Sequence, residues 1–246
     1  MNMRIDRKVA LLGHSRERAK ELIKNGQVSV GGKVCTKPGM EVSESDDVAI
    51  TGDTLKYAGR GGLKLEYALE HFKLGVKGFV CLDIGASTGG FSDCLLQHGA
   101  LKVYAADVGH GQLAQKLRTD SRVINMEKTD IRRLLKLPEP VDFVCADVSF
   151  ISLKHIFPEI YRFMRPGMTA VVLVKPQFEV GRNNLNKKGI VKDVRLIEKT
   201  VSDLKEFAEG LGFQVLGVCP SPIKGGDGNE EFLFVLTVTE CSRRRA

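Results

Sequence analysis

Tryptophan is absent from this chain of 246 residues, and no two of its six cysteines form a C-x-x-C pair. The cysteines are scattered: Cys35, Cys81, Cys94, Cys145, Cys219 and Cys241. Three of them, Cys81, Cys145 and Cys219, lie in apolar strand-like runs. Because a metal site or a disulfide framework needs clustered ligands, we expect reduced core thiols and no metal.

Long apolar runs are also missing. No run reaches the roughly 18 residues that a membrane span requires. The first ten residues, MNMRIDRKVA, carry charges with no apolar segment behind them, unlike a signal peptide. Hydrophobic residues at 43% and charged residues at 27% are ordinary for globular proteins, which argues against disordered and fibrous classes. We expect a cytoplasmic protein of one or two domains that does not enter a membrane.

The positive charge is concentrated at one end of the chain. Nine of the 37 Lys and Arg residues but only three of the 30 Asp and Glu residues lie in residues 1–40, which leaves 28 and 27 for residues 41–246. Nearly all of the formal net charge of +7 therefore lies in the first forty residues. Such a patch indicates a polyanionic partner, either nucleic acid or an anionic membrane surface.

A short helix is predicted over SRERAKELIKNG, with Ser15 as its N-cap and Asn25-Gly26 as a left-handed stop. Arg16, Lys20 and Lys24 recur at i, i+4 and i+8 and so line one face, while apolar residues occupy the other. The run QVSVGGKVC then predicts a tight hairpin, and residues 48–50 a further strand.

The segment RIDRKVALLGHSRERAKELIKNGQVSVGGKV resembles the RNA-binding fold of the fourth small-subunit ribosomal protein, which also occurs in pseudouridine synthases. The resemblance implies that the basic residues of this unit contact RNA: Arg4, Arg16, Arg18, Lys20, Lys24 and Lys33. A solvated face on a generic small domain is the alternative. The one-sided placement of the charge favours RNA.

Residues 51–60, TGDTLKYAGR, predict a linker, so we divide the chain into domains 1–58 and 59–246. Five strand-like runs then alternate with helical runs. The strands are FVCLDI, LKVYAAD, RVINM, VDFVCAD and TAVVLVK, and the helical runs include GQLAQKLR and DIRRLLKL. FQVLGVCP and EEFLFVLTV follow without a helix between them, which indicates an antiparallel hairpin at a sheet edge. The pattern predicts an α/β, Rossmann-like sheet of seven strands.

The first βα turn of this sheet, DIGASTGGF, contains small residues that let a ligand approach the backbone closely. A dinucleotide site would use the same turn. However, Asp83 stands where it would repel a pyrophosphate, and Ser87 replaces the middle glycine of G-x-G-x-x-G. These two residues disfavour an NAD-linked oxidoreductase and suit a ligand that bears a sulfonium and an ammonium group.

Candidate cofactor ligands follow from this turn: Asp83, Gly85, Ala86, Ser87, Gly89, Gly90 and Phe91. Asp107 ends the second strand, where an acidic side chain meets the ribose hydroxyls of a bound nucleoside. Asp130 follows the third strand and has two equal interpretations, an acceptor for an adenine amino group or an ordinary helix N-cap.

Four polar residues occur within or beside apolar runs, where an ordinary hydrophobic core would exclude polar side chains. Asp147 ends VDFVCAD, Lys175 ends TAVVLVK, Lys64 lies in RGGLKLEYAL, and Glu231 precedes the last strand. Taken singly, such residues are usually solvated strand ends. The carboxyl ends of parallel strands form the ligand crevice of an open α/β sheet, however, so Asp147 and Lys175 are expected to face the same ligand.

The ordered motifs GRGGLKLEYAL, CLDIGASTGGFSDCLL, ADVSFISL, LVKPQFEVGR and GNEEFL resemble, over nearly the whole chain, the TlyA or hemolysin-A family of ribosomal RNA ribose methyltransferases, whose catalytic half is FtsJ-like. The resemblance implies S-adenosylmethionine as cofactor, ribosomal RNA within subunits as partner, and a tetrad of Lys64, Asp147, Lys175 and Glu231. Glu230 competes for the last place, and we favour Glu231 because it directly precedes the Phe-Leu pair.

The implied reaction methylates a ribose 2′-hydroxyl of a cytidine, and the short termini favour the large subunit. Lys175 would accept or polarise the hydroxyl proton with help from Lys64, although the sequence does not decide which lysine carries it. Asp147 and Glu231 would orient the lysines. Further basic residues are candidates for RNA contact, with solvated loops as the alternative: Arg60, Arg182, Lys187 and Lys188.

One family feature is missing, because residues 55–58 read LKYA where the family often has an Arg-x-Trp motif, so coupling of the linker to the cofactor is in doubt. Two further functions remain as alternatives. A membrane-active hemolysin would need an insertion segment, and none is visible. A non-catalytic RNA-binding protein of the same fold is disfavoured by the four tetrad positions. No obligate protein partner is indicated.

Overall fold

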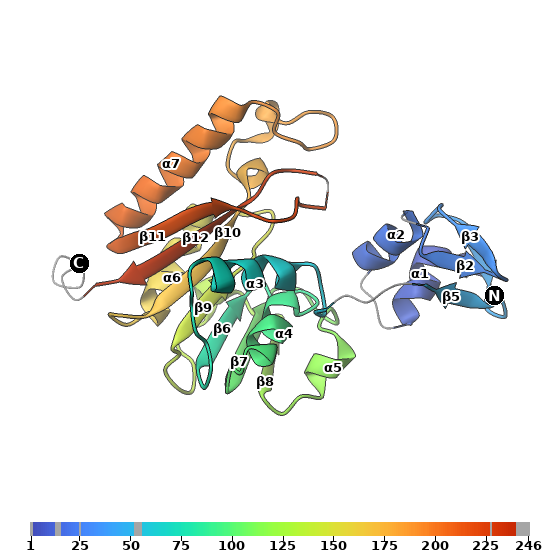
Figure 1. Ribbon diagram of the computed structural model, residues 1–246, viewed down its shortest axis with the longest axis horizontal. Helices are drawn as coiled ribbons and strands as arrows, with labels where there is room; N and C mark the ends of the chain where they lie inside the picture. Colours follow the sequence, from blue (N-terminus) through green and yellow to red (C-terminus); the bar gives the residue numbers. More distant parts are fainter. Residues whose placement is uncertain (1, 13–15, 25, 52–55, 227, 240–246) are drawn as a thin grey trace.

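The computed structural model describes residues 2–12, 16–24, 26–51, 56–226 and 228–239, with only the backbone for residues 17, 18 and 21. It contains a small N-terminal unit and a larger unit, which Figure 1 shows as separate bodies. Each unit has its own hydrophobic core. The small unit has one cluster of buried side chains and the larger unit has two, and no cluster contains side chains from both units.

The small unit combines two helices with five short strands. Its elements are β1 (Asn2–Arg4), α1 (Ile5–Leu11), α2 (Arg16–Lys24), β2 (Val28–Val30), β3 (Lys33–Cys35), β4 (Glu41–Ser43) and β5 (Val48–Ile50). The strands form a three-stranded sheet in the order β3-β2-β5 and a separate β1-β4 pair. Helix α2 and the β2-β3 hairpin were predicted, whereas α1, β1 and β4 were not. Ser15 and Asn25 lie outside the described residues.

Helix α2 is amphipathic as its spacing predicts. Ala19, Leu22 and Ile23 are fully buried in the core of the small unit, while Arg16 and Lys24 are exposed. Gly26 adopts a φ of +71°, which is the left-handed conformation expected of a helix stop. The helix therefore presents cations on its solvent side.

The larger unit is built on a seven-stranded sheet in the order β11-β12-β10-β9-β6-β7-β8. Its strands are β6 (Val80–Ile84), β7 (Lys102–Asp107), β8 (Val123–Glu127), β9 (Phe143–Ala146), β10 (Thr169–Val174), β11 (Phe213–Pro220) and β12 (Phe232–Val238). Strands β6 to β10 are parallel, and β12 runs antiparallel to both β10 and β11. The predicted terminal hairpin at a sheet edge is confirmed.

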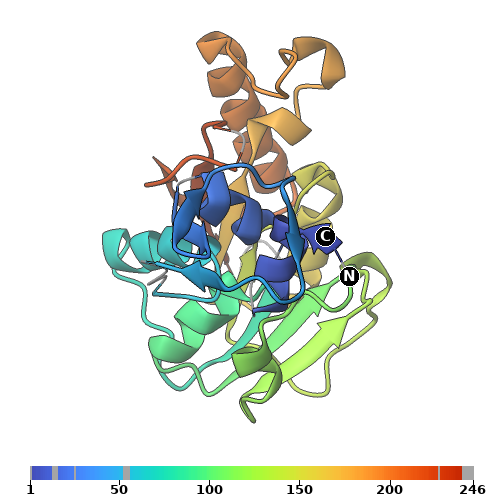
Figure 2. The same ribbon diagram turned by 90° about the vertical axis from the view of Figure 1, so that its right-hand side faces the viewer.

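Helices cover both faces of this sheet (Figures 1 and 2). They are α3 (Gly61–His71), α4 (Gly90–Gln97), α5 (Gln115–Arg118), α6 (Phe157–Phe163) and α7 (Val194–Gly210). One core forms between the sheet and α3 and α4, and the other between the sheet and α6 and α7. Strands buried on both faces explain why their sequences are continuously apolar.

The predicted helix over DIRRLLKL is wrong. Only a single 3₁₀ turn forms there, Ile131–Arg133. The Arg162 guanidinium donates to the carbonyl oxygens of Ile131, Leu134 and Leu135 at 3.3, 2.6 and 2.7 Å, which are acceptors that a helix would use internally. The predicted helix GQLAQKLR also shortens, to the four residues of α5.

The described cysteines are free and buried, as expected: Cys35, Cys81, Cys94, Cys145 and Cys219. Cys241 lies outside the described residues. Among the helices of the described chain, none is long and apolar enough to cross a membrane.

Tyr57, which the sequence assigned to the linker, packs in the core of the larger unit and is 2% exposed. Its hydroxyl donates to Glu66 Oε1 at 2.8 Å. Burial and this hydrogen bond raise the pKa of Tyr57. A Cβ at Gly62 would lie 2.4 Å from the Tyr57 ring, so α3 approaches the ring as closely as only glycine allows. Ordered packing of the larger unit thus starts before the predicted boundary at residue 59.

We expect Tyr57→Ala to destabilise the protein by about 3–5 kcal/mol, because it empties a closed site in the core. Tyr57→Phe keeps the ring and removes one hydrogen bond, so we expect a loss of about 1 kcal/mol in the free energy of unfolding. Urea unfolding followed by far-UV circular dichroism measures both. A Tyr57→Ala protein as stable as the wild type would show that the tyrosine is not part of the core.

Candidate active site

The glycine turn joins β6 to α4 and has a backbone shape that side chains would obstruct. Gly85 and Gly89 have φ values of +83° and +91°. A Cβ at Gly85 would lie 2.5 Å from the carbonyl oxygen of Asp147, and one at Gly89 would lie 2.1 Å from Leu117 Cδ1. Ser87 adopts a φ of +49°, which costs strain in a residue with a side chain. The turn is therefore tightly fixed beside Asp147.

Of the acidic residues at the neighbouring strand ends, Asp107 contacts this turn and Asp130 does not. Asp107 accepts hydrogen bonds from the backbone N–H groups of Ser87 at 2.8 Å and Gly109 at 2.6 Å. Asp130 accepts a hydrogen bond from the Arg132 backbone N–H and pairs with the Arg132 guanidinium at 2.7 Å. It thus occupies the N-cap position of the 3₁₀ turn, which is one of the two roles considered from the sequence. Ala86, Gly90 and Phe91 are buried within the turn and the start of α4.

Glu127 was not predicted and lies at the end of β8. Its carboxylate accepts from the backbone N–H groups of Gln112 at 2.6 Å and Leu113 at 3.1 Å. Burial alone would raise its pKa, but these and further hydrogen bonds lower the pKa to about 2. Glu127 therefore fixes the loop after β7 that runs past the glycine turn. The sequence carried no sign of this, because the contacts that fix the loop are made to backbone N–H groups fourteen and fifteen residues away.

Asp83 lies beneath the turn and is completely buried. Its Oδ2 accepts from the Ser92 hydroxyl at 2.7 Å, while Oδ1 accepts no hydrogen bond from the described residues. Burial raises the pKa of Asp83 to about 7, and the nearby charge of Asp147 adds to the rise. A buried carboxylate with an unused oxygen fits a cationic ligand group, which would stabilise its charged form.

The four tetrad positions form two lysine-carboxylate pairs. Lys175 Nζ lies 2.6 Å from Asp147 Oδ1, and the Lys64 and Glu231 side chains form a second ion pair. The Lys64 and Glu231 side chains are 8% and 3% exposed, while those of Lys175 and Asp147 are 11% and 21% exposed. Buried charges of this kind persist only when they are paired.

The sheet brings these residues to one edge. Val174 of β10 pairs with Phe232 of β12, so Lys175 and Glu231 are the next residues on adjacent strands. The Asp147 backbone N–H donates to the Ile84 carbonyl at 2.9 Å, which places Asp147 beside the glycine turn. A Cβ at Gly61 would lie 3.5 Å from Asp147 Oδ2, so the first turn of α3, which leads to Lys64, packs on the same carboxylate.

The two adjacent glutamates differ in burial and in partner. Glu231 is 4% exposed and pairs with Lys64. Glu230 is exposed and lies 3.9 Å from Lys224. The buried pair supports Glu231 as the fourth member.

Sequence reasoning missed three residues beside Lys175. Ser149 Oγ accepts from Lys175 Nζ at 2.8 Å. Phe150 is 91% exposed, has a φ of +63°, and lies with its ring centre 5.0 Å from that of Phe178. Lys175 Nζ lies 5.8 Å from the Phe178 ring centre. A strained, solvent-facing aromatic at the strand end is an exception to normal packing. The only available signal was its position three residues after Asp147.

The end of the linker packs directly on the glycine turn. The Ala58 N–H donates to Asp93 Oδ2 of α4 at 2.7 Å, and Gln97 Nε2 donates to the Lys56 carbonyl at 2.9 Å. A Cβ at Gly90 would lie 3.0 Å from the Gly59 carbonyl oxygen. Residues 56–59 thus contact the turn although the chain lacks tryptophan.

The predicted RNA-contacting residues fall into two groups. In the small unit, Arg4 and Arg16 both pair with the buried carboxylate of Asp6, at 3.1 and 3.6 Å. Lys24 and Lys33 are exposed and Lys20 is half-buried, while the side chain of Arg18 lies outside the described part. In the larger unit, Arg60 lies near Gly226. Exposed cations also occur on the loop after β10: Arg182, Lys187 and Lys188.

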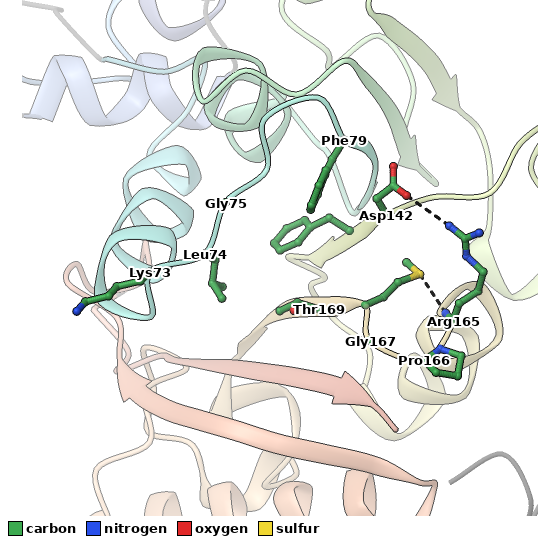
Figure 3. Close-up of a pocket in the computed structure, with 11 residues that line it drawn as sticks. Lys73, Leu74, Gly75, Phe79, Asp142, Arg165, Pro166, Gly167 and Thr169 are labelled. Carbon is green, nitrogen blue, oxygen red and sulfur yellow. Dashed lines mark hydrogen bonds and ion pairs between the residues drawn. The ribbon is translucent and has the colours of Figure 1, made fainter. Parts of the chain in front are cut away.

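A cavity of about 600 Å³ lies elsewhere, between the turn after α3 and residues 165–169 (Figure 3). Asp142, Thr169 and Phe79 line it at the amino ends of β9, β10 and β6. Asp147 and Lys175 follow the carboxyl ends of β9 and β10, so this cavity lies at the opposite end of those strands from the candidate site. No cluster of His, Cys, Asp or Glu suited to a metal occurs among the described residues.

The sheet has seven strands with one antiparallel strand, a glycine turn after β6, which is the middle one of strands β6 to β10, and two lysine-carboxylate pairs near its carboxyl edge. This arrangement defines the class of methyltransferases that use S-adenosylmethionine. Comparison with known proteins agrees. Residues 57–238 match the FtsJ-like methyltransferase family, and residues 3–48 match the S4 domain. The chain belongs to the FtsJ-like methyltransferase family, in the branch formed by TlyA and hemolysin A proteins.

Three relatives illustrate the similarity. The 16S/23S rRNA (cytidine-2′-O)-methyltransferase TlyA of Mycobacterium tuberculosis is 43% identical over 93% of this chain and 87% of its own length. Hemolysin A of Brachyspira hyodysenteriae is 42% identical over 94% of this chain and 98% of its length. A solved structure from Streptococcus thermophilus, described as a "putative hemolysin", is 42% identical over 97% of this chain and 89% of its own, with a TM-score of 0.77.

Proposed function

We propose that this enzyme transfers a methyl group from S-adenosylmethionine to a ribose 2′-hydroxyl of ribosomal RNA, with a cytidine of the large subunit as its target. The observation that carries the proposal is the presence of two lysine-carboxylate pairs near the glycine turn, the half-buried Lys175–Asp147 pair and the buried Lys64–Glu231 pair. The names of the TlyA relatives support ribosomal RNA and a cytidine. The TlyA protein of Campylobacter jejuni, 37% identical to this chain, is named for 23S rRNA alone, which favours the large subunit.

The residues of the turn suit the cofactor. S-adenosylmethionine supplies an electrophilic methyl group on a sulfonium centre. Asp83 would offer its unused oxygen to the positive end of the cofactor. Asp107, at the end of β7, would meet the ribose hydroxyls. Gly85 and Gly89 let the turn pack tightly against Asp147 and Leu117, which fixes its shape. Asp130 has its carboxylate engaged by Arg132, so its contact with adenine would require exchange of that partner.

The paired lysines would act on the RNA hydroxyl. The neutral amine form of Lys175 would accept the proton of the 2′-hydroxyl as its oxygen bonds to the methyl group that the cofactor supplies. Asp147 and Ser149 hold that nitrogen at 2.6 and 2.8 Å, which fixes its direction. Lys175 adjoins the exposed Phe150, where RNA would arrive, whereas Lys64 is enclosed with Glu231. We therefore assign the proton transfer to Lys175 and electrostatic support to Lys64.

RNA would be held by the small unit and by basic residues around the site. Arg4 and Arg16 project from a unit that matches the S4 domain, and Lys187 and Lys188 lie beyond the tetrad edge. Contacts of this kind neutralise phosphates and give affinity that falls with salt. Arg60, at the start of α3, would contact RNA nearer the reacting hydroxyl.

Phe150 offers its ring as a stacking surface for a base of the substrate. Removing one base-aromatic stack costs about 1–3 kcal/mol. We therefore expect Phe150→Ala to lower kcat/KM for RNA by roughly 5- to 150-fold while the Kd for S-adenosylmethionine stays unchanged. Phe150→Tyr retains the ring and serves as the control. Equal kcat/KM values for the alanine and tyrosine variants would remove the stacking role.

The target is tested by offering purified 30S subunits, 50S subunits and naked ribosomal RNA to the enzyme with methyl-labelled S-adenosylmethionine. Nucleoside analysis of the product then identifies the base. The proposal predicts 2′-O-methylcytidine in 50S subunits. Label confined to 30S subunits would contradict the subunit assignment, and label on another base would contradict the cytidine. An absence of label from all three would favour the non-catalytic RNA-binding alternative.

A further inference from the structure

Asn229 is a buried polar residue outside the tetrad. It is 3% exposed and stands two residues before Glu231. Its Oδ1 accepts from the backbone N–H of Val191 at 3.0 Å, and its Nδ2 donates to the carbonyl oxygen of Gly189 at 3.0 Å. Both partners lie about forty residues earlier in the chain, on the loop between β10 and α7. One side chain therefore ties this loop to the loop that precedes β12.

The loop held by Asn229 is a closed turn. Asn186 Oδ1 accepts from the backbone N–H groups of Lys188 at 2.8 Å and Ile190 at 3.0 Å. The Asn186 backbone N–H donates to the Ile190 carbonyl at 3.0 Å, and Gly189 has a φ of +74°. We call residues 186–190 the lysine turn, because Lys187 and Lys188 lie at its tip.

The lysines of this turn have no partner within the described part of the protein. Lys187 and Lys188 are exposed, and neither forms an ion pair or hydrogen bond through its side chain with a described residue. Two adjacent unpaired cations on an ordered backbone suit a phosphate, which binds lysine as a point charge. Ordering them beforehand lowers the entropic cost of binding.

The same segment also holds Glu231. The Gly225 backbone N–H donates to the Asn229 carbonyl at 2.9 Å. A Cβ at Gly225 would lie 2.5 Å from Glu231 Oε1, so the loop closes tightly over that carboxylate. In Figure 1 the two loops, orange and red, extend side by side from the same edge of the sheet. Asn229 therefore contacts the lysine turn through its side chain and, through its backbone carbonyl, Gly225, which packs closely on Glu231.

We infer that Asn229 is a positioning residue that holds the lysine turn as a phosphate clamp in fixed register with the Lys64–Glu231 pair. The inference rests on the proposed function, because it assigns the clamp to the RNA backbone of that substrate. Through Asn229, a phosphate held at Lys187 and Lys188 is set at a constant distance from the reacting ribose. Fixing this distance affects the KM for RNA more than the kcat for methyl transfer.

The test is the salt dependence of RNA binding. Removing one lysine-phosphate contact reduces the slope of log K against log salt by about 0.7–0.9. The Lys187→Ala/Lys188→Ala variant is thus expected to lower the slope by about 1.4–1.8. Asn229→Ala removes no charge, yet we expect it to lower the slope by a similar amount and to raise KM for 50S subunits, with kcat within about 3-fold of the wild type. Asn184→Ala, on the same loop, is the matched control.

A double-mutant cycle makes the inference specific. In the Lys187→Ala/Lys188→Ala background, Asn229→Ala is expected to cause no further change in KM or slope, because the residues act as one unit. Gly189→Ala leaves the Asn229 side chain in place but strains the lysine turn at its φ of +74°. It is expected to reproduce the Asn229→Ala result, which covers the case in which Asn229→Ala fails to fold. Additive effects, or an unchanged salt slope in both Asn229→Ala and Gly189→Ala, would overturn the inference.

Equilibrium binding to purified 50S subunits is measured alongside methyl transfer. A wild-type protein that binds subunits with the expected salt slope but transfers no methyl group contradicts the proposed function and leaves the clamp intact. If the wild type methylates subunits but none of these variants changes the salt slope of binding, the clamp is contradicted and the proposed function is not.

Discussion

Lys175→Ala is expected to reduce kcat for methyl transfer by about 10³-fold or more, since it removes the group that takes the hydroxyl proton. The Kd for S-adenosylmethionine should stay within about 3-fold of the wild type, because Lys175 Nζ contacts Asp147 and Ser149 rather than the glycine turn. Single-turnover methylation of subunits measures the first quantity, and calorimetric titration the second. The variant should fold normally, because Asp147 is 21% exposed and keeps contact with water.

Lys64→Ala has a different expected signature. It leaves Glu231 buried and unpaired, so a stability loss of about 3–5 kcal/mol should accompany the loss of activity. Combining Lys64→Met with Glu231→Gln removes both charges, and we expect stability to return while methylation stays absent. Full activity in both Lys175→Ala and Lys64→Ala would contradict the tetrad assignment.

Asp83→Asn is expected to weaken binding of S-adenosylmethionine by at least about 10-fold, because it removes the negative charge beneath the turn. Binding of S-adenosylhomocysteine, which lacks the sulfonium, should change less. In the wild type the pKa of Asp83 is about 7, so affinity for the cationic cofactor should rise between pH 6 and pH 8. In Asp83→Asn this rise should disappear. Identical pH profiles of affinity for the two proteins would show that the charge of Asp83 does not contribute to cofactor binding.

The same residue sets the pH dependence of stability. The pKa of Asp83 is raised by folding from its ordinary value of 3.8 to about 7, mainly by burial. Its protonated form therefore stabilises the folded state fully below about pH 4, and this contribution is lost as pH rises to about 7. Relative to Asp83→Asn, the wild type should lose on the order of a few kcal/mol between pH 5 and pH 8. Urea unfolding at the two pH values measures the difference.

The sheet and the tetrad edge were predictable from sequence because their signals are local. A doubly covered parallel strand must be continuously apolar, so Asp147 and Lys175 mark the points where β9 and β10 end. Parallel strands place those ends at one edge. The sequence motif favoured Glu231 over Glu230 as the fourth tetrad member, and Glu231 is the glutamate that is buried against Lys64.

What escaped prediction depends on contacts between distant segments. Arg162 removes the acceptors that a helix over DIRRLLKL would need, and no pattern within that run reveals it. Tyr57 looked like linker because its partners, Glu66 and Gly62, lie on the following helix. Asn229 reads as a turn residue, and its bonds to Gly189 and Val191 appear only in the folded chain.

The central claim is that this protein methylates a ribose hydroxyl of ribosomal RNA by means of Lys175. The most direct measurement is alkaline hydrolysis of RNA from subunits labelled by the wild type and by Lys175→Ala. Since 2′-O-methylation blocks cleavage of the adjacent phosphodiester, the account predicts label in an alkali-resistant dinucleotide for the wild type and none for the variant. Label released in mononucleotides, or equal labelling by both proteins, would contradict it.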